Sequence, residues 1–186
     1  RFQGYWKDVG TIQSYWESNM DLIRTLPEFN LYEDFWKIYT NSDHQPPQYT
    51  AADAKVEESL LSDGCEVYGE VYRSILGPGV IVEKGAVVKD SIIMAGTTIG
   101  EGSLVDKCVI DEKCKIGKNV QMGVGEDVAN ELKPAIYNTG ITVLGMNSVV
   151  PDAVVLGKNC VISGATVAAD YPDGRLESGK SVMREV

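Results

Sequence analysis

The chain has 186 residues, of which 44% are hydrophobic and 24% are charged, so it can bury a core as one domain with an attached segment. Its formal net charge of −10 argues against nucleic acid and against a membrane surface as partners, because both favour a basic protein face. No apolar run approaches the ~20 residues of a membrane-spanning helix, and the polar first residues are unlike a signal peptide. A cytoplasmic location is therefore expected.

The first 50 residues contain one expected helix and a linker. Thr11 is a suitable N-cap for a helix over residues 12–24, which Pro27 ends. One face of this helix is apolar at helical spacing and consists of Ile12, Tyr15, Trp16, Met20 and Ile23. A second apolar anchor follows in Trp36, Ile38 and Tyr39. The polar, proline-rich run 41–50 is expected to be a linker or a surface loop.

Residues 82–122 repeat themselves with a period of 17 residues. Within each repeat, aliphatic residues follow one another in steps of six, five and six residues. Such a short period, with a polar turn after each aliphatic residue, indicates a solenoid whose coils must stack to bury a core. The residues expected to point inward are Val82, Val88, Ile93, Ile99, Val105, Ile110 and Ile116.

The turns between these steps support the same fold. The residue three places after the aliphatic one is Gly85, Gly96, Gly102, Lys113, Asn119, Asn147, Ala153 or Asn159. Most of these are Gly or Asn, which tolerate the positive φ of a tight corner. The following small residue is expected to turn inward, as in Ala86, Thr97, Ser103 and Cys114. An ordinary β-sandwich would need longer alternating runs, so the fold class is an all-β solenoid with a short N-terminal helical segment.

The repeat divides the chain into three parts, with residues 1–50 before the solenoid, 51–169 within it and 170–186 after it. One corner recurs on successive coils at Ser59, Ser74, Ser91 and Cys108. The rhythm stops over about 123–143, and this excursion is either a functional loop or a disordered one. Residues 170–186 show no repeat and are expected to pack loosely along the solenoid or against a neighbour.

The cysteines and the single histidine limit the chemistry. No CxxC pair occurs, which favours reduced core cysteines over zinc ligands or disulfides at Cys65, Cys108, Cys114 and Cys160. The steps of about six residues resemble the hexapeptide repeat. This repeat occurs in acyltransferases with a histidine base and in γ-type carbonic anhydrases with three histidine ligands. The one histidine, His44, lies before the coils. An acyltransferase is therefore less favoured, and the carbonic anhydrase zinc site cannot be built.

Several strings of residues resemble a known family over essentially the whole chain. The chain is similar to the carboxy-terminal part of bacterial glucose-1-phosphate adenylyltransferase in YWKDVGT, SYWESNMDL, LYEDFWKIYT, PPQY and SLLSDGCEV. The resemblance implies that the solenoid is a left-handed parallel β-helix, joined to an amino-terminal Rossmann-like nucleotidyltransferase domain. Residues 1–50 would then be the end of that domain and the linker. It also implies the conversion of ATP and glucose 1-phosphate to ADP-glucose and pyrophosphate, in glycogen biosynthesis.

The resemblance assigns roles to a few residues. Asp8 is expected as a catalytic residue and a Mg²⁺ ligand in the intact enzyme, with closure of the turn before the helix as its alternative role. Its neighbours Tyr5, Trp6 and Lys7 are candidates for the substrate site. For Lys7 a solvated lysine is the favoured interpretation, and for Trp6 it is a packing or domain-coupling role. Lys180 and Arg184 are candidates for an allosteric effector site, but this tail is less basic than that of strongly activated members of the family, which favours solvated tail charges.

The family's Gly-rich phosphate loop and base-recognition residues have no counterpart in this chain. The sequence is therefore expected to be a fragment that binds no magnesium and has no activity alone. The β-helix is expected to serve allosteric coupling and assembly, as a homo-oligomer or with a homologous subunit. The apolar helix face is expected under the catalytic domain in the intact enzyme, and on the chain's own solenoid or a second copy here. A regulatory or assembly subunit without catalysis remains the alternative.

Overall fold

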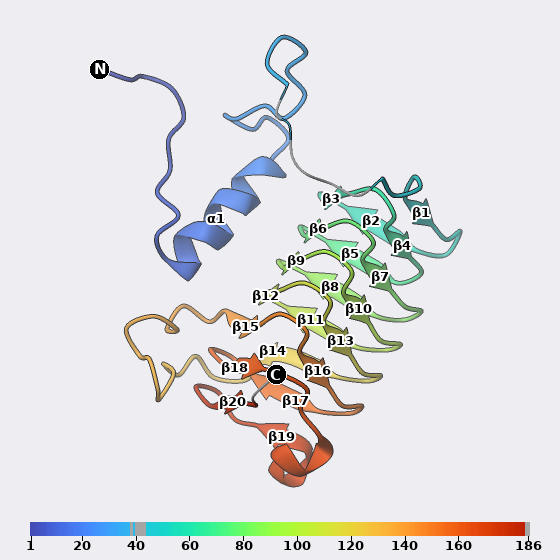
Figure 1. The fold of residues 1–186 in the computed structure, drawn as a ribbon, viewed down its shortest axis with the longest axis vertical. Helices are drawn as coiled ribbons and strands as arrows, with labels where there is room; N and C mark the ends of the chain where they lie inside the picture. Colours follow the sequence, from blue (N-terminus) through green and yellow to red (C-terminus); the bar gives the residue numbers. More distant parts are fainter. Residues whose placement is uncertain (38, 40–43, 185–186) are drawn as a thin grey trace.

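The repeat region is a parallel β-solenoid built from three sheets (Figure 1). The computed structural model describes residues 1–37, 39 and 44–184, so the expected anchor residue Ile38 lies outside the described residues. The first sheet contains β1 (Tyr49–Thr50), β4 (Glu66–Val67), β7 (Ile81–Val82), β10 (Thr98–Ile99), β13 (Lys115–Ile116) and β16 (Val149–Val150). All of its strand pairs are parallel.

The other two sheets have seven strands each. The second contains β2 (Lys55–Glu57), β5 (Glu70–Tyr72), β8 (Val87–Lys89), β11 (Leu104–Asp106), β14 (Gln121–Val124), β17 (Val155–Gly157) and β19 (Arg175–Leu176). The third contains β3 (Leu60–Leu61), β6 (Ile75–Leu76), β9 (Ile92–Ile93), β12 (Cys108–Ile110), β15 (Thr142–Leu144), β18 (Val161–Ser163) and β20 (Ser181–Met183). Each of the coils from β1 to β18 contributes one short strand to each sheet, as the steps of about six residues predict, and the last coil adds β19 and β20 to the second and third sheets.

The expected core is confirmed residue by residue. All seven aliphatic side chains predicted to point inward are at most 3% exposed. Ile99 shows why the 17-residue period matters, because it pairs with Val82 on one side and with Ile116 on the other. Equivalent aliphatic residues therefore stack directly on one another along the solenoid axis.

The expected corners are confirmed as well. All eight corner residues have positive φ, including Lys113 at 57° and Ala153 at 60°. The residues that follow these corners are buried, namely Ala86, Thr97, Ser103 and Cys114.

A different corner precedes the strands of the third sheet. Its residues at positive φ are Glu58, Arg73, Asp90 and Lys107. There the Ser91 hydroxyl accepts from the backbone N–H of Cys108 at 3.0 Å, and the Ser74 hydroxyl accepts from Ser91 N–H at 3.1 Å.

The C-terminal end corrects the sequence prediction. Residues 170–186 were expected to pack loosely, but β19 and β20 pair with β17 and β18 and continue the solenoid. Arg175 lies beside Val155, a spacing of 20 residues that hides this coil from a 17-residue period. The added length is taken up by two 3-10 turns, Ala168–Asp170 and Pro172–Gly174. The start is also one strand earlier than expected, since β1 precedes residue 51.

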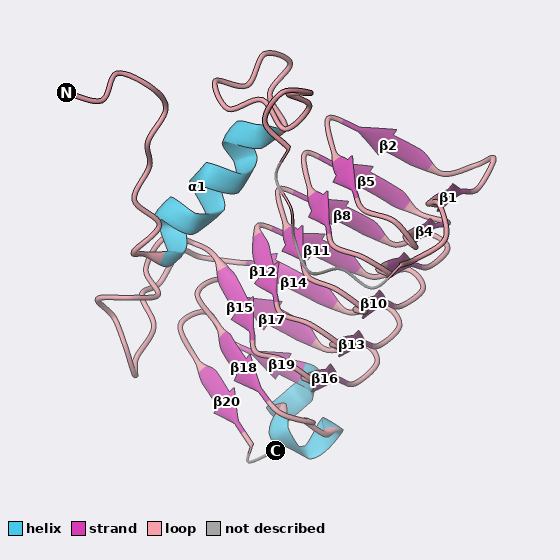
Figure 2. Ribbon diagram, turned by 45° about the horizontal axis from the view of Figure 1, so that its top comes forward, coloured by secondary structure: helices cyan, strands magenta, loops and turns pink. Residues whose placement is uncertain are grey.

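The one α-helix among the described residues, α1 (Ile12–Leu22), lies along the side of the solenoid that carries β12 and β15 (Figure 2). Thr11 caps it as expected, because its hydroxyl accepts from Ser14 N–H at 3.1 Å and Ser14 Oγ accepts from Thr11 N–H at 3.1 Å. Its apolar face packs against the outward side chains of the third sheet and a loop residue, namely Ile92, Val109 and Ile141. The chain's own solenoid therefore covers this face, which is one of the two arrangements expected for the chain alone.

Among the helices that the structure describes, none has the length and apolar character needed to cross a membrane.

Candidate functional site

The segment that contains Asp8 is held against α1 by Asp21. The Lys7 ammonium donates to Asp21 Oδ2 at 2.8 Å, and the Tyr5 hydroxyl donates to the same oxygen at 3.4 Å. The hydrogen bond between Lys7 and Asp21 lowers the pKa of the carboxyl group and raises the pKa of the ammonium group. Arg24 lies 2.9 Å from the other carboxylate oxygen. Lys7 is therefore the partner of a carboxylate rather than a free cation in this structure.

Asp8 closes the turn before α1, and it is exposed. Its Oδ1 accepts from Gly10 N–H at 3.0 Å, which is the capping geometry expected as its alternative role. Trp6 is 77% exposed, whereas the Tyr5 ring lies 6.1 Å from the ring of Phe29. Within the described part of the chain, no three His, Cys, Asp or Glu side chains are grouped to bind a metal. Asp8 offers one carboxylate, and these residues alone do not form a magnesium site.

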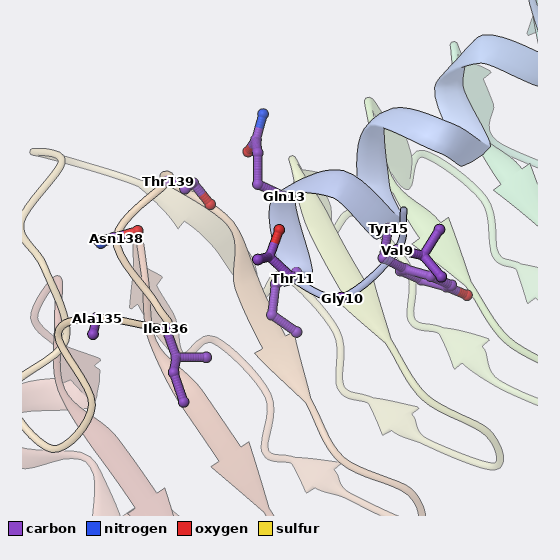
Figure 3. Close-up of a pocket in the computed structure, with 10 residues that line it drawn as sticks. Val9, Gly10, Thr11, Gln13, Tyr15, Ala135, Ile136, Asn138 and Thr139 are labelled. Carbon is purple, nitrogen blue, oxygen red and sulfur yellow. The ribbon is translucent and has the colours of Figure 1, made fainter. Parts of the chain in front are cut away.

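A pocket lies between the end of this segment and the loop formed by residues 125–141. Figure 3 shows Asn138 and Thr139 of the loop on one side of the pocket, and Thr11 and Gln13 at the start of α1 on the other. The lining residues are Val9, Gly10, Thr11, Ile12, Gln13, Tyr15, Ala135, Ile136, Asn138 and Thr139. No charged side chain lines the pocket, so it offers methyl groups and neutral polar groups to a neighbour.

Two buried asparagine side chains hold this loop on the last coils. Asn130 donates to Asn159 O and to Ser181 Oγ, both at 2.9 Å. Asn159 accepts from Gly140 N–H at 2.7 Å and donates to Asp127 Oδ1 at 2.7 Å. The excursion expected near residues 123–143 is therefore an anchored loop. Sequence reasoning identified Asn159 only as a corner residue and gave no signal for Asn130.

The two candidate effector residues already have carboxylate partners. Lys180 is paired with Glu131 of the loop. Arg184 donates to both oxygens of Asp170, at 2.7 Å and 2.5 Å, and this pair lowers the pKa of Asp170. Both cations belong to the last coil, so the structure does not bring them together with Asp8. Their role toward an effector stays a prediction.

The model of a protein family described as "GlmU-like, C-terminal hexapeptide" matches residues 46–144, more than half of the chain. The chain belongs to this hexapeptide family. The match covers the coils from β1 to β15 and the loop between β14 and β15, in agreement with the observed solenoid. The segment with Asp8 and α1 lies outside the matched residues, so its assignment depends on longer relatives.

Three such relatives are glucose-1-phosphate adenylyltransferases. The protein of Acetivibrio thermocellus is 50% identical over 184 residues, 99% of this chain and 43% of the relative. That of Lachnospira eligens is 60% identical over 183 residues, 98% of this chain and 43% of the relative. That of Thermosipho melanesiensis is 63% identical over 161 residues, 87% and 39%. The expected resemblance to the carboxy-terminal part of this enzyme is confirmed. The chain spans about two fifths of the length of these relatives.

One solved structure, the acetyltransferase domain of PglB from Neisseria gonorrhoeae, is similar with a TM-score of 0.44 and 17% identity. The similar region covers 74% of this chain and 50% of the acetyltransferase chain.

Proposed function

We propose that this chain is the carboxy-terminal part of a cytoplasmic glucose-1-phosphate adenylyltransferase, which converts ATP and glucose 1-phosphate to ADP-glucose and pyrophosphate in glycogen biosynthesis. The observation that carries the proposal is the 50–63% identity to three enzymes of this name. For two of them the aligned region is 98–99% of the chain, so it includes the segment with Asp8 as well as the solenoid.

In the complete protein, Asp8 would contribute one carboxylate oxygen to Mg²⁺. A bound magnesium ion neutralises charge on the polyphosphate during nucleotidyl transfer. The pairing of Lys7 with Asp21 supports a positioning role for Lys7, and Tyr5 acts on the same carboxylate. Trp6, which is exposed, is the residue of this segment left to contact substrate or the rest of the enzyme.

The solenoid would serve as the scaffold for assembly. It would also couple the binding of an effector, for which Lys180 and Arg184 are the candidate residues, to activity. Because the apolar face of α1 is covered by the solenoid, self-association depends on other apolar surface. The exposed large apolar side chains that follow α1 are Leu26, Phe29, Leu31, Tyr32, Phe35, Trp36 and Tyr39. They support an assembly with further copies of the protein or with a homologous subunit.

The test is synthesis of ADP-glucose by the complete protein that contains this sequence, with ATP, glucose 1-phosphate and Mg²⁺. Asp8→Asn should reduce kcat by about 100-fold or more, since a lost metal ligand removes several kcal/mol of transition-state stabilisation. Asp53→Asn, at an exposed carboxylate of the first coil, is the matched control and should leave kcat unchanged. The isolated chain should make no ADP-glucose. A complete protein that binds a catalytic homologue but turns over nothing would instead be a regulatory subunit.

A further inference from the structure

Lys107 lies where the solenoid, α1 and the loop meet. It occupies the corner between β11 and β12 with φ at 51°. Its ammonium group lies 5.6 Å from the centroid of the Trp16 ring of α1 and donates to the carbonyl oxygen of Thr139 in the loop at 2.7 Å. One side chain of the solenoid therefore contacts both of the elements that line the pocket in Figure 3.

The orientation of Trp16 is fixed from two successive coils. Its indole N–H donates to the carbonyl oxygen of Asp90 at 2.7 Å, and Asp90 is the corner residue one coil before Lys107. The indole has no other polar hydrogen, and its electron-rich face attracts a cation within about 6 Å. Trp16 is thus held at its edge by Asp90 and at its face by Lys107.

The loop approaches Lys107 through a glycine. Gly140 has φ at 78°, and a Cβ added to it would lie 3.4 Å from Lys107 Nζ and 3.1 Å from Asp127 Oδ2. Its N–H is held by the buried Asn159 side chain. Among the ion pairs of the residues that the structure describes, none involves Lys107. The contacts of this ammonium group are therefore a loop carbonyl and an aromatic ring rather than a carboxylate.

We infer that Lys107 is a positioning residue that couples the loop to α1, and through α1 to the segment that contains Asp8. The contacts run from Thr139 to Lys107 and Trp16, and then along α1 to Asp21 and Lys7. The inference rests on the proposed function in one respect, because it makes the position of Asp8 depend on the loop. Displacement of the loop would loosen α1 and lower turnover at the Asp8 site.

The first test measures amide hydrogen exchange in this chain and needs no activity. Lys107→Met removes the ammonium group and keeps the aliphatic stem, and Lys107→Arg keeps the charge and the donors. In Lys107→Met, amides of residues 12–22 and 136–141 should exchange about 10-fold faster, because one cation–π contact and one hydrogen bond are lost. Lys107→Arg should restore most of the protection. Lys89→Met, which breaks an ion pair with Asp106 at 3.0 Å one coil earlier, is the matched control and should change neither region.

The second test measures coupling. Gly140→Ala disturbs the loop beside Lys107, and it should accelerate exchange in both the loop and α1. In the Lys107→Met background the same change should accelerate exchange in the loop only, because the link to α1 is already broken. Equal acceleration of α1 in both backgrounds would overturn the inference. Unchanged exchange in the inward residues of β10 and β13 verifies that every variant keeps the solenoid.

The third test uses the complete protein. Lys107→Met should lower kcat several-fold with less change in KM for glucose 1-phosphate, and Lys107→Arg should recover the rate. An inactive complete protein contradicts the proposed function, whereas the exchange results still decide the coupling. An active protein in which Lys107→Met changes neither the exchange of α1 nor kcat contradicts the inference and leaves the proposed function intact.

Discussion

The Asp21 carboxylate accepts a hydrogen bond from the Lys7 ammonium at 2.8 Å, across fourteen positions of the sequence. Asp21 belongs to α1, whose apolar side chains pack on the third sheet. The helix is thus an adaptor with two differently used faces, because its polar residues bind the preceding segment while its apolar residues bind the solenoid. Through this arrangement the rigid coils determine where the exposed Asp8 lies.

Replacement of Asp21 should loosen the segment before α1. In Asp21→Asn, amides of residues 5–10 should exchange faster than in the unchanged protein, because Lys7 loses its charged partner. The effect is small, about 1 kcal/mol or less for a pair at the surface. Glu17→Gln, whose carboxylate lies 3.6 Å from Lys7, should have a smaller effect. Equal exchange in all three proteins would show that the pair does not hold the segment.

The same pair predicts a pH dependence. The pKa of Asp21 is lowered from 3.8 by its hydrogen bond with Lys7. The contribution of Asp21 to the stability of the folded segment is therefore present above that value and is lost as the pH falls through the lowered pKa. The pKa of Lys7 is raised from 10.5, so its contribution is present below that value and is lost as the pH rises through the raised pKa. The exchange ratio between Asp21→Asn and the unchanged protein should therefore be constant from about pH 5 to 9 and approach one in stronger acid.

The inward assignment of Ile99 predicts a large loss of stability on truncation. Ile99 is fully buried between Val82 and Ile116, so Ile99→Ala should lower the free energy of unfolding by about 2–5 kcal/mol. Ile99→Asp should be worse, because it places an unpaired charge in the dry core. Thr98→Asp changes the neighbouring side chain on the outer face and is the control. Urea denaturation followed by circular dichroism measures all three, and an unchanged midpoint for Ile99→Asp contradicts the assignment.

The cysteines should be unreactive in the folded protein. All four are free and buried. Burial raises the pKa of Cys114 to about 11 and that of Cys160 to about 11, and it raises the pKa of Cys65 and Cys108 as well. Because the thiolate is the reactive form, a disulfide reagent at pH 8 should label all four thiols only after denaturation. Rapid labelling of the native protein would place at least one cysteine outside the core.

Tyr171 is expected to stabilise the C-terminal end of the solenoid. Its ring is 3% exposed within the core cluster, and its hydroxyl lies 2.6 Å from Thr166 Oγ1. The Thr166 hydroxyl donates to Val149 O, so Tyr171 is the donor of this bond. Tyr171→Phe should cost about 1 kcal/mol and Tyr171→Ala about 3–5 kcal/mol in urea denaturation. Equal losses for the two variants would mean that the ring contributes no packing.

The regular part of the fold follows from local spacing. The inward position of Val82 or Ile116 and the positive φ of Asn119 repeat from coil to coil, because each coil presents the same corner chemistry to the next. Thr11 and the apolar spacing after it likewise predict α1, although the helix ends at Leu22 and not at residue 24. These features need only the residues of one coil or one helix, so sequence reasoning finds them.

The resemblance of the Asp8 motif to a known family also came from the sequence, but the surroundings of Asp8 came from the tertiary structure. The sequence pattern does not connect Lys7 with Asp21, or Asn130 with the last coil. In each pair one residue lies in a segment without a repeat, so no spacing rule relates it to its partner. The final coil escaped the sequence prediction for the same reason, since its 20-residue spacing from β17 to β19 accommodates two 3-10 turns. The repeating core could be predicted from the sequence alone, because the same spacing of aliphatic and corner residues recurs in successive coils. The surfaces that cover α1 and hold the loop were shown only by the tertiary structure, because those contacts join residues far apart in the sequence.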